Sequence, residues 1–435
     1  METPQPSPRP LPRRAIMAAC CLGMCAISFA VTGGPICLTS LAADLKMGRP
    51  EQGVFLGMPC WGLTVAILLV GPLADRLGVR ALMAVGAAMQ IAGLVLVSQA
   101  GSVWTAYAGG TLIGGGCGVA DALLSPIVCA IYPERRMRMS GLLHSFYAIG
   151  LVATVLILLA VLAADWSWRS AFPLLAVLIV PYGLLVLVLP LPAQAHEGAQ
   201  RLPARQIVRR GAFWLLVGAI FMSGVTELGP GGWLPAFVQK AAEDSRAAAA
   251  RGQPSPWAEA AQDSRIADPP GQATAAEKTV HDSRLAGALG LLAFGVTMAV
   301  GRLTVSAVIY RLGVRRLFLV GGALCAMSLM MASLPVGSIW SAGWLALLGL
   351  GVAGFWPTII ATAGDRFPRA GASMFSLLSA AGNLGGVVGP VAIGLVADHS
   401  GLHIAMRVMA LVPVATLVLI WSGVPRGHTV GRLGN

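Results

Sequence analysis

Two acidic residues of this 435-residue chain, Asp121 and Glu227, stand well inside long apolar stretches. A charged side chain at the centre of a membrane helix costs about 2.5–3.5 kcal/mol on insertion scales, so few are retained without a function. An apolar setting also favours the protonated form of a carboxylic acid, which suits a group that must gain and lose a proton. We therefore expect Asp121 and Glu227 to couple the movement of protons to the movement of a solute.

The residues before Asp121 indicate which way its side chain points. Gly110, Gly114 and Gly118 follow one another at four-residue spacing, a pattern typical of tight helix packing in membranes. Asp121 and Ser125 extend the same stripe, so the acid should face other helices and not lipid. The alternative is a structural hydrogen bond to a neighbouring helix, and proton-coupled uptake by an Asp121→Asn variant would separate the two.

Glu227 lies in a run rich in glycine, from Gly224 through Pro230 to Trp233. These residues predict a broken or flexible helix, and irregular backbone at membrane depth normally lines a cavity. Trp233 could be a stacking platform for a sugar or an anchor at the membrane interface. The alternative for Glu227 is a position in a water-filled outer vestibule.

Further polar residues within the apolar stretches are candidates for substrate binding. His144 and Tyr147 could form hydrogen bonds with a solute, or they could have a packing role. Asn383 offers an amide among glycines, and Trp356 precedes a proline that predicts a kink. Arg302 could pair with a carboxylate or gate the inner side, and the alternative is that it reaches the lipid headgroups.

The composition requires lipid around most of the chain. Hydrophobic residues make up 56% and charged residues 11%, with a mean hydropathy of +0.77, whereas soluble domains have about 25% charged residues. Apolar runs of about 20 residues predict membrane helices, and hence an all-α integral membrane protein. We expect twelve spans: 15–36, 53–74, 81–99, 104–131, 141–163, 169–190, 212–237, 285–308, 316–334, 339–362, 372–396 and 404–424.

The distribution of arginine predicts the orientation of these spans. Arginines gather in alternate connections: 9, 13 and 14; 76 and 80; 135, 136 and 138; 201, 205, 209 and 210; 311, 315 and 316; 366 and 369; 426 and 432. The other short connections hold few basic residues, which places both termini in the cytoplasm. The net charge of +12 thus reflects the topology of the spans. A nucleic-acid partner is not expected, because the basic residues do not cluster on one soluble face.

The pentapeptide Arg76-Leu77-Gly78-Val79-Arg80 recurs letter for letter as Arg311-Leu312-Gly313-Val314-Arg315. Such a repeat indicates two duplicated six-helix lobes, a feature of secondary transporters. With Gly71, Asp75 and Arg302, the arginines of the two copies are candidates for a cytoplasmic gate. In the second copy Tyr310 stands where the first has Asp75.

The resulting domain prediction has two lobes and several polar segments. The lobes are residues 15–190 and 212–424, joined by a cytoplasmic linker at 191–211, with cytoplasmic tails at 1–14 and 425–435. We expect residues 239–284 to form an extracytoplasmic insertion in a loop. It contains the tripeptide Asp-Ser-Arg three times at a 19-residue period, beginning at Asp244, Asp263 and Asp282.

Several kinds of site are not expected. No phosphate-binding loop, zinc-ligand spacing or nucleophile elbow occurs, so we expect no enzyme activity, cofactor or metal. All eight cysteines lie in or beside apolar spans, where packing is the expected role.

The run from Gly71 to Arg80 resembles the signature between the second and third helices of the major facilitator superfamily. Asp121-x-x-x-Ser125-Pro126 further resembles the E-x-x-x-N-P pattern of the fucose–proton symporter branch. Serine replaces the asparagine here, and the first span carries no carboxylate. The resemblance implies a central cavity that opens alternately to each side, with Asp121 as the proton-linked acid.

These observations predict a secondary transporter that moves a small polar solute, for example a monosaccharide, by proton symport. The alternative is a proton-driven exporter of drugs or metabolites, which would need a more apolar cavity. The expected partners are the solute, protons and the lipid bilayer, with the chain working as a monomer in a bacterial inner membrane.

Overall fold

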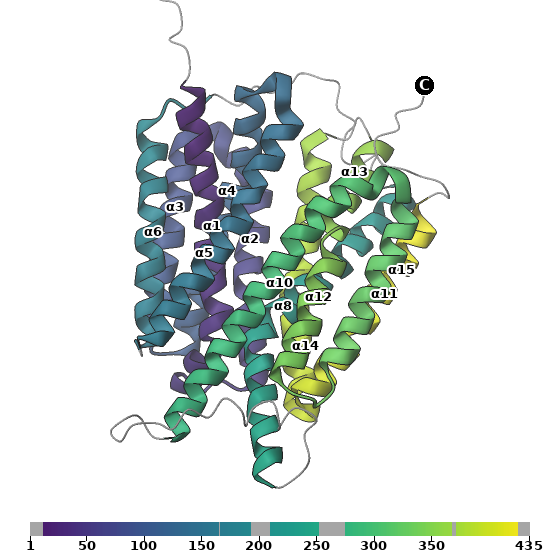
Figure 1. Cartoon of the computed structure of the whole chain (residues 1–435). Coiled ribbons are helices and arrows are strands. Elements are labelled where there is room, and N and C mark those ends of the chain that lie inside the picture. Colours follow the sequence, from purple (N-terminus) through teal and green to yellow (C-terminus); the bar gives the residue numbers. More distant parts are fainter. Residues whose placement is uncertain (1–11, 165, 193–208, 252–274, 368–370, 425–435) are drawn as a thin grey trace, which may run out of the picture.

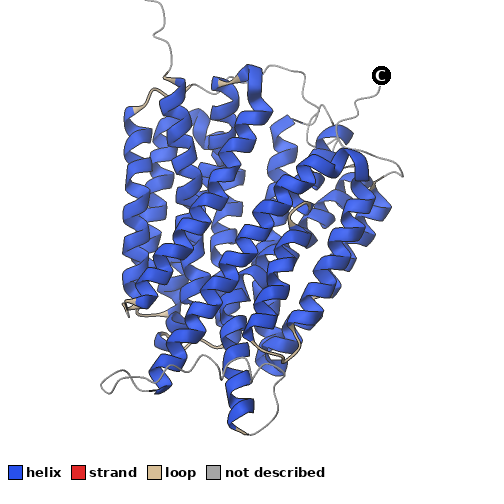
Figure 2. Ribbon diagram, viewed as in Figure 1, coloured by secondary structure: helices blue, strands red, loops and turns tan. Residues whose placement is uncertain are grey.

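The computed structural model describes residues 12–164, 166–192, 209–251, 275–367 and 371–424, and within these ranges every regular element is a helix (Figure 2). The prediction of an all-α membrane protein is confirmed. The α-helices are α1 (Arg13–Asp44), α2 (Arg49–Leu77), α3 (Val79–Ser98), α4 (Val103–Ile131), α5 (Arg136–Ala163), α6 (Trp168–Val188), α8 (Gly211–Ala250), α10 (Ala275–Leu312), α11 (Val314–Ala332), α12 (Ser338–Val352), α13 (Phe355–Arg366), α14 (Gly371–Met409) and α15 (Leu411–Gly423).

Eleven helical segments of the described ranges are long and apolar enough to cross a membrane. The last of these, Met374–Gly423, is 50 residues long, whereas about 20 helical residues cross the apolar core of a bilayer. Gly401 interrupts it with φ 81° and ψ 162°. This segment therefore contains the last two of the twelve expected spans.

The helices form two groups that stand side by side (Figure 1). Helices α1–α6, the N-terminal lobe, lie on the left of the view, and α8–α15, the C-terminal lobe, lie on the right. Helix α1 begins, and α15 ends, at the upper end of the bundle. We call this the basic end, because Arg13, Arg80 and Arg315 lie there, and we call the opposite one the distal end.

The stripe of glycines before Asp121 packs α4 tightly against α2. A methyl group on Gly114 would collide with the carbonyl of Pro59, and one on Gly118 would lie 2.7 Å from the carbonyl oxygen of Leu63. Close approach of two helix backbones requires such small residues. The expected packing role of the stripe is confirmed, and it fixes the face of α4 that carries Asp121.

The two copies of the repeated pentapeptide adopt the same backbone conformation. Gly78 has φ 80° and ψ 151°, and Gly313 has φ 73° and ψ 160°. Residues with a side chain rarely adopt such positive φ angles, so glycine allows the sharp turns into α3 and α11. The duplication seen in the sequence is thus a duplication of structure at these turns.

The sequence predicted a broken or flexible helix around Glu227. The helix is continuous, so the predicted break was wrong. Helix α8 runs through both Pro230 and Pro235 without interruption. Its glycines serve close packing instead: a methyl group on Gly224 would collide with the carbonyl of Gly382 on α14. The expected kink near Trp356 is confirmed, because α12 ends at Val352 and α13 begins at Phe355.

The predicted extracytoplasmic loop is helical in the parts that the structure describes. Helix α8 continues to Ala250, and α10 begins at Ala275. The first and third Asp-Ser-Arg copies therefore lie on helices, whereas the copy at 263–265 falls outside the described residues. A run rich in alanine and charge extends a helix readily once a membrane span has begun it.

Candidate functional site

A polar group of the N-terminal lobe lies where α4 and α5 meet. The Ser125 hydroxyl on α4 is 3.1 Å from Nε2 of His144 on α5. Asp121, one turn earlier on α4, is partly buried and interacts electrostatically with the same imidazole. The acid therefore faces another helix of the bundle, and its neighbour is a side chain that can also exchange a proton.

A second polar group belongs to the C-terminal lobe. Nη2 of Arg302 on α10 is 3.2 Å from Oε1 of Glu227 on α8, with 12% of the Glu227 side chain and 39% of the Arg302 side chain exposed. Paired charges of this kind are tolerated at membrane depth because each partly neutralises the other. The sequence indicated both residues, but it did not identify them as partners.

The two groups interact across the boundary between the lobes. The charge of Arg302 acts on His144 and Tyr147 of α5, and Glu227 also acts on Tyr147. Asp121, His144, Tyr147, Glu227 and Arg302 thus form one cluster, which we call the central cluster. It contains groups that can bind a proton, together with hydrogen-bond donors and acceptors for a polar solute.

Trp356 and Asn383 lie together in the C-terminal lobe. The Trp356 ring packs against Gly382, where a methyl group would collide with it, and the ring remains partly exposed. Asn383 is only 8% exposed, and its amide donates to the carbonyl of Ser379 on its own helix at 2.9 Å. Trp356 therefore has surface left for a solute, whereas Asn383 offers little in this conformation.

Trp233 is fully buried at the distal end, where it leaves no surface for a solute in this conformation. Its indole Nε1 donates to the carbonyl of Pro390 on α14 at 3.0 Å. The guanidinium of Arg49, at the start of α2, lies 5.9 Å from the centre of the ring. Trp233 thus joins two helices of its own lobe and contacts an arginine of the other lobe.

The lobes pack closely at the distal end. A methyl group on Gly53 of α2 would lie 2.5 Å from the carbonyl oxygen of Pro390, and one on Gly57 would lie 3.0 Å from that of Val387. The Thr39 hydroxyl of α1 donates to Oε1 of Gln239 on α8 at 2.8 Å. Two pairs of helices therefore close this end.

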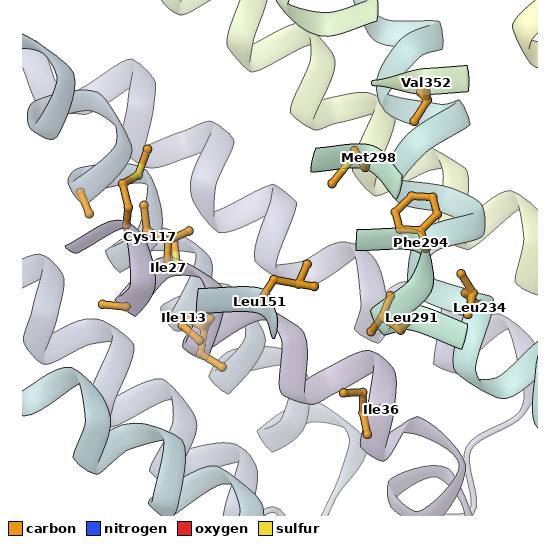
Figure 3. Packing of buried hydrophobic residues seen from close by; sticks show 14 of the residues in the cluster. Ile27, Ile36, Ile113, Cys117, Leu151, Leu234, Leu291, Phe294, Met298 and Val352 are labelled. Atoms are coloured by element: carbon orange, nitrogen blue, oxygen red, sulfur yellow. The ribbon is translucent and has the colours of Figure 1, made fainter. Parts of the chain in front are cut away.

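A third contact between the lobes lies deeper in the bundle. Leu151 of α5 points toward the part of α10 that carries Leu291 and Phe294 (Figure 3). The contact is close, since a methyl group on Gly295 would collide with the Leu151 side chain. Apolar packing of α5 on α10 thus adds to the contacts between the lobes made by Thr39 with Gln239 and by Gly53 and Gly57.

The corresponding positions toward the basic end lack such contacts. No atom lies within 4 Å of a methyl group built on Gly71 of α2 or on Gly141 of α5. Both residues stand on helices whose other ends pack against the opposite lobe. The contacts between the lobes described above thus lie toward the distal end, whereas the surroundings of Gly71 and Gly141 are open.

Arginines proposed as a gate at the basic end are bonded within their own lobes. Arg80 donates to the carbonyl of Leu189, at the end of α6, at 3.0 Å. Arg315 donates to the carbonyls of Trp421 and Val424, at the end of α15, at 2.7 and 2.8 Å. These contacts cap helix ends, and in this conformation they do not cross between the lobes.

The remaining gate candidates are accounted for as follows. Gly71, Asp75 and Arg76 are exposed near the end of α2, and Asp75 has an interaction partner. The side chain of Arg311 lies outside the described residues. Arg302 belongs to the central cluster.

Sequence reasoning missed the residues that close the distal end: Thr39, Arg49 and Gln239. Each is a common polar residue at the end of an apolar run, with no motif around it. Their roles depend on which helices of the two lobes meet, which the order along the chain does not specify. Among the described residues, no group of three or more His, Cys, Asp or Glu side chains could hold a metal ion.

Comparison with known proteins gives one family and several structural relatives. The sequence profile of the Major Facilitator Superfamily matches residues 16–252 and 272–433. Membrane protein MosC of Rhizobium meliloti is 23% identical over 365 residues, which are 84% of this chain and 79% of MosC.

Two solved structures share the fold at low sequence identity. The xylose transporter XylE from E. coli, in a partially occluded inward open conformation, has a TM-score of 0.71 at 13% identity, covering 95% of this chain and 99% of XylE. The nucleoside transporter NupG has a TM-score of 0.66 at 13% identity, covering 94% of this chain and 98% of NupG.

Proposed function

Because this chain belongs to the Major Facilitator Superfamily, a family of membrane transporters, we propose that it is a secondary active carrier that moves a small polar solute together with protons. The observation that carries the proposal is the central cluster, in which His144, the neighbour of Asp121 in one lobe, interacts with Arg302, the partner of Glu227 in the other. A solute bound between them contacts both lobes, which is what alternating access requires.

The charges of the central cluster support a solute without a net negative charge. Arg302 is compensated by Glu227 at 3.2 Å, and Asp121 adds a further acid. A polyhydroxylated solute can donate hydrogen bonds to the carboxylates and accept them from Arg302 and Tyr147. The partly exposed ring of Trp356 can pack on the apolar face of a sugar. A monosaccharide or a molecule of similar polarity fits this chemistry.

Asp121 is the proposed site of the coupled proton. It is the acid that a sequence likeness to the fucose–proton symporter branch assigns to this role, and its charged neighbour in the central cluster is His144. Protonation removes its charge, which lowers the cost of burying the cluster when the lobes close around the solute.

We further propose that the basic end faces the cytoplasm of a bacterial inner membrane. Arginine-rich connections remain on the cytoplasmic side during membrane insertion. With this orientation the structure is an inward-open conformation, closed on the outer side by α1, α2, α8 and α14.

Uptake into proteoliposomes under an imposed pH gradient tests the function. Thermal-shift screening of the purified chain with monosaccharides, nucleosides and cationic dyes first identifies a ligand. Uptake of that ligand driven by an inward proton gradient supports the proposal. Stabilisation by cationic dyes alone, with outward movement driven by the gradient, would instead assign the chain to the exporters.

A further inference from the structure

Each lobe has a polar clasp at the distal end that ties its first helix to a later one, α1 to α6 and α8 to α14, and the two clasps differ in chemistry. In the N-terminal lobe, Asp44 at the end of α1 accepts a hydrogen bond from the indole Nε1 of Trp168 at 2.7 Å and lies 3.7 Å from Nη2 of Arg169. Both donors hold their protons at any physiological pH. The clasp of the N-terminal lobe is therefore independent of pH.

Arg169 also ties this clasp to the neighbouring helix. It donates to the carbonyls of Ser98 and Ala100 at the end of α3, both at 2.9 Å. The Ser98 hydroxyl donates back to the carbonyl of Arg169 at 2.8 Å. The end of α1, the start of α6 and the end of α3 are thus held together by fixed donors.

The C-terminal lobe has the same arrangement with a histidine in the central place. Asp244 on the distal extension of α8 lies 3.4 Å from Nε2 of His403, just after the Gly401 turn. Nδ1 of His403 is 3.0 Å from the carbonyl of Ser333, at the end of α11. Arg407 donates to the Ser333 hydroxyl at 3.2 Å, as the counterpart of Arg169.

An acceptor oxygen lies beside each nitrogen of His403. A carbonyl oxygen only accepts, so Nδ1 must carry a hydrogen to bond with Ser333. A neutral imidazole then presents the lone pair of Nε2 to the carboxylate of Asp244, and two acceptors face each other. In the described structure Nε2 is a buried atom without a hydrogen bond, and such atoms are rare and costly. An imidazolium would instead place an N–H group on the side of each oxygen and form an ion pair with Asp244 at 3.4 Å.

The other charged groups around His403 do not bind Oδ2 of Asp244, the carboxylate oxygen nearest to Nε2 of His403. On α8, Lys240 binds the other oxygen of Asp244, Oδ1, at 2.8 Å. On its own helix, Arg407 is bonded to Ser333, and His399 bonds the carbonyl of Leu395. Phe237 of α8 packs edge-on against the ring, with centroids 5.0 Å apart. Asp244 is the acidic group among these neighbours.

We propose that His403 and Asp244 form a second proton-binding site, separate from the central cluster, which clamps the distal part of α8 to α14 and α11 of the same lobe when it is protonated. The clamped part of α8 also carries Gln239, whose bond with Thr39 closes the distal end. Histidine is the side chain whose charge changes between pH 5 and 8. The site is exposed to the pH outside the cell in the orientation proposed above, on which this part of the inference rests. This inference does not depend on which solute is transported.

A double-mutant cycle at two pH values tests the site in the full-length chain in nanodiscs. Thermal unfolding is measured for the wild type, His403→Gln, Asp244→Asn and the double variant at pH 6.0 and pH 8.5. We expect the two single changes to lower the melting temperature non-additively at pH 6.0, because either one breaks the same ion pair. At pH 8.5 the coupling should vanish, since the stabilising proton has left.

Asp44→Asn is the matched control, because its partners Trp168 and Arg169 donate at both pH values. It should lower the melting temperature equally at pH 6.0 and pH 8.5. Equal coupling between His403 and Asp244 at both pH values, or no coupling at either, would overturn the proposal. If a variant fails to fold, the ¹⁵N signals of His403 in the labelled wild-type protein decide. Two protonated nitrogens at pH 6.0 support the site, and a neutral ring overturns it.

Discussion

Arg80 and Arg315 are the last residues of two identical pentapeptides, and each caps the last helix of its own lobe. Arg80 donates to the carbonyl of Leu189, whereas Arg315 donates to those of Trp421 and Val424 and lies over the Trp421 ring at 5.3 Å. The last carbonyls of a helix have no partner within it, and a cation there also complements the helix dipole. The repeat therefore preserves a structural bond within each lobe.

Removing either cap should lower stability more than it affects transport. Arg80→Ala loses one charge-assisted hydrogen bond, worth about 1 kcal/mol at an exposed position. Arg315→Ala loses two bonds and the contact with Trp421, so its melting temperature should fall further. Thermal unfolding of the purified variants measures both, and Arg316→Ala, an exposed neighbour, controls for the loss of charge. Unchanged melting temperatures together with altered uptake would contradict the capping role and support a role of Arg80 and Arg315 in a gate.

The close approach of the lobes at Gly53 predicts a way to open the distal end. Gly53→Leu places a branched side chain against the carbonyl of Pro390, where even a methyl group lacks room. The conformation closed at the distal end should become disfavoured, because α2 and α14 can no longer meet. A single cysteine at Thr39, in a background without other cysteines, should then react several-fold faster with an impermeant thiol reagent added outside.

Gly71→Leu is the matched control for that experiment. It lies on the same helix, and no atom is within 4 Å of a methyl group at this position. Its labelling rate at position 39 should stay within a factor of two of the parent. Equal rates for Gly53→Leu and Gly71→Leu would contradict the assignment of a closed distal end.

The Glu227–Arg302 pair predicts a characteristic pattern of single and double variants. Arg302→Met leaves the carboxylate of Glu227 without its partner at membrane depth, and Glu227→Gln does the same to the guanidinium. Removing one member of such a pair destabilises more than replacing both with neutral groups. Each single variant should therefore unfold at a lower temperature than Glu227→Gln combined with Arg302→Met.

Transport should separate the role of the pair from its effect on stability. If Glu227 and Arg302 bind the solute, the double variant keeps a folded structure but loses uptake by at least about tenfold, the effect of one lost bond to a charged group. Double-variant uptake close to that of the wild type would remove the pair from the binding site.

The sequence predicted the fold well because membrane spans have strong local signals. Spans 81–99 and 104–131 differ from α3 and α4 by at most two residues at either end. The prediction was poorer where a helix continues beyond its apolar run, as α8 does to Ala250, because hydropathy marks the edge of the apolar run and not the end of the helix. The predicted break at Glu227 is absent for a related reason, since Gly224 of this helix serves close packing against α14.

The members of the central cluster were predicted one by one, but their pairing was not. Asp121 and Glu227 were conspicuous because a carboxylate in an apolar run is costly. That Arg302 contacts Glu227, 75 positions earlier, depends on the rotation of α10 against α8, which hydropathy does not encode. The contacts of Thr39, Arg49 and Gln239 at the distal end could not be predicted from the sequence for the same reason.

Proton movement driven by the solute tests the role of Asp121 most directly. Proteoliposomes without a pH gradient receive the solute identified by the thermal-shift screen, and a trapped dye records the internal pH. The account predicts that wild-type uptake acidifies the lumen, whereas Asp121→Asn produces no acidification yet still exchanges labelled for unlabelled solute. Acidification by Asp121→Asn at the wild-type rate would contradict the account.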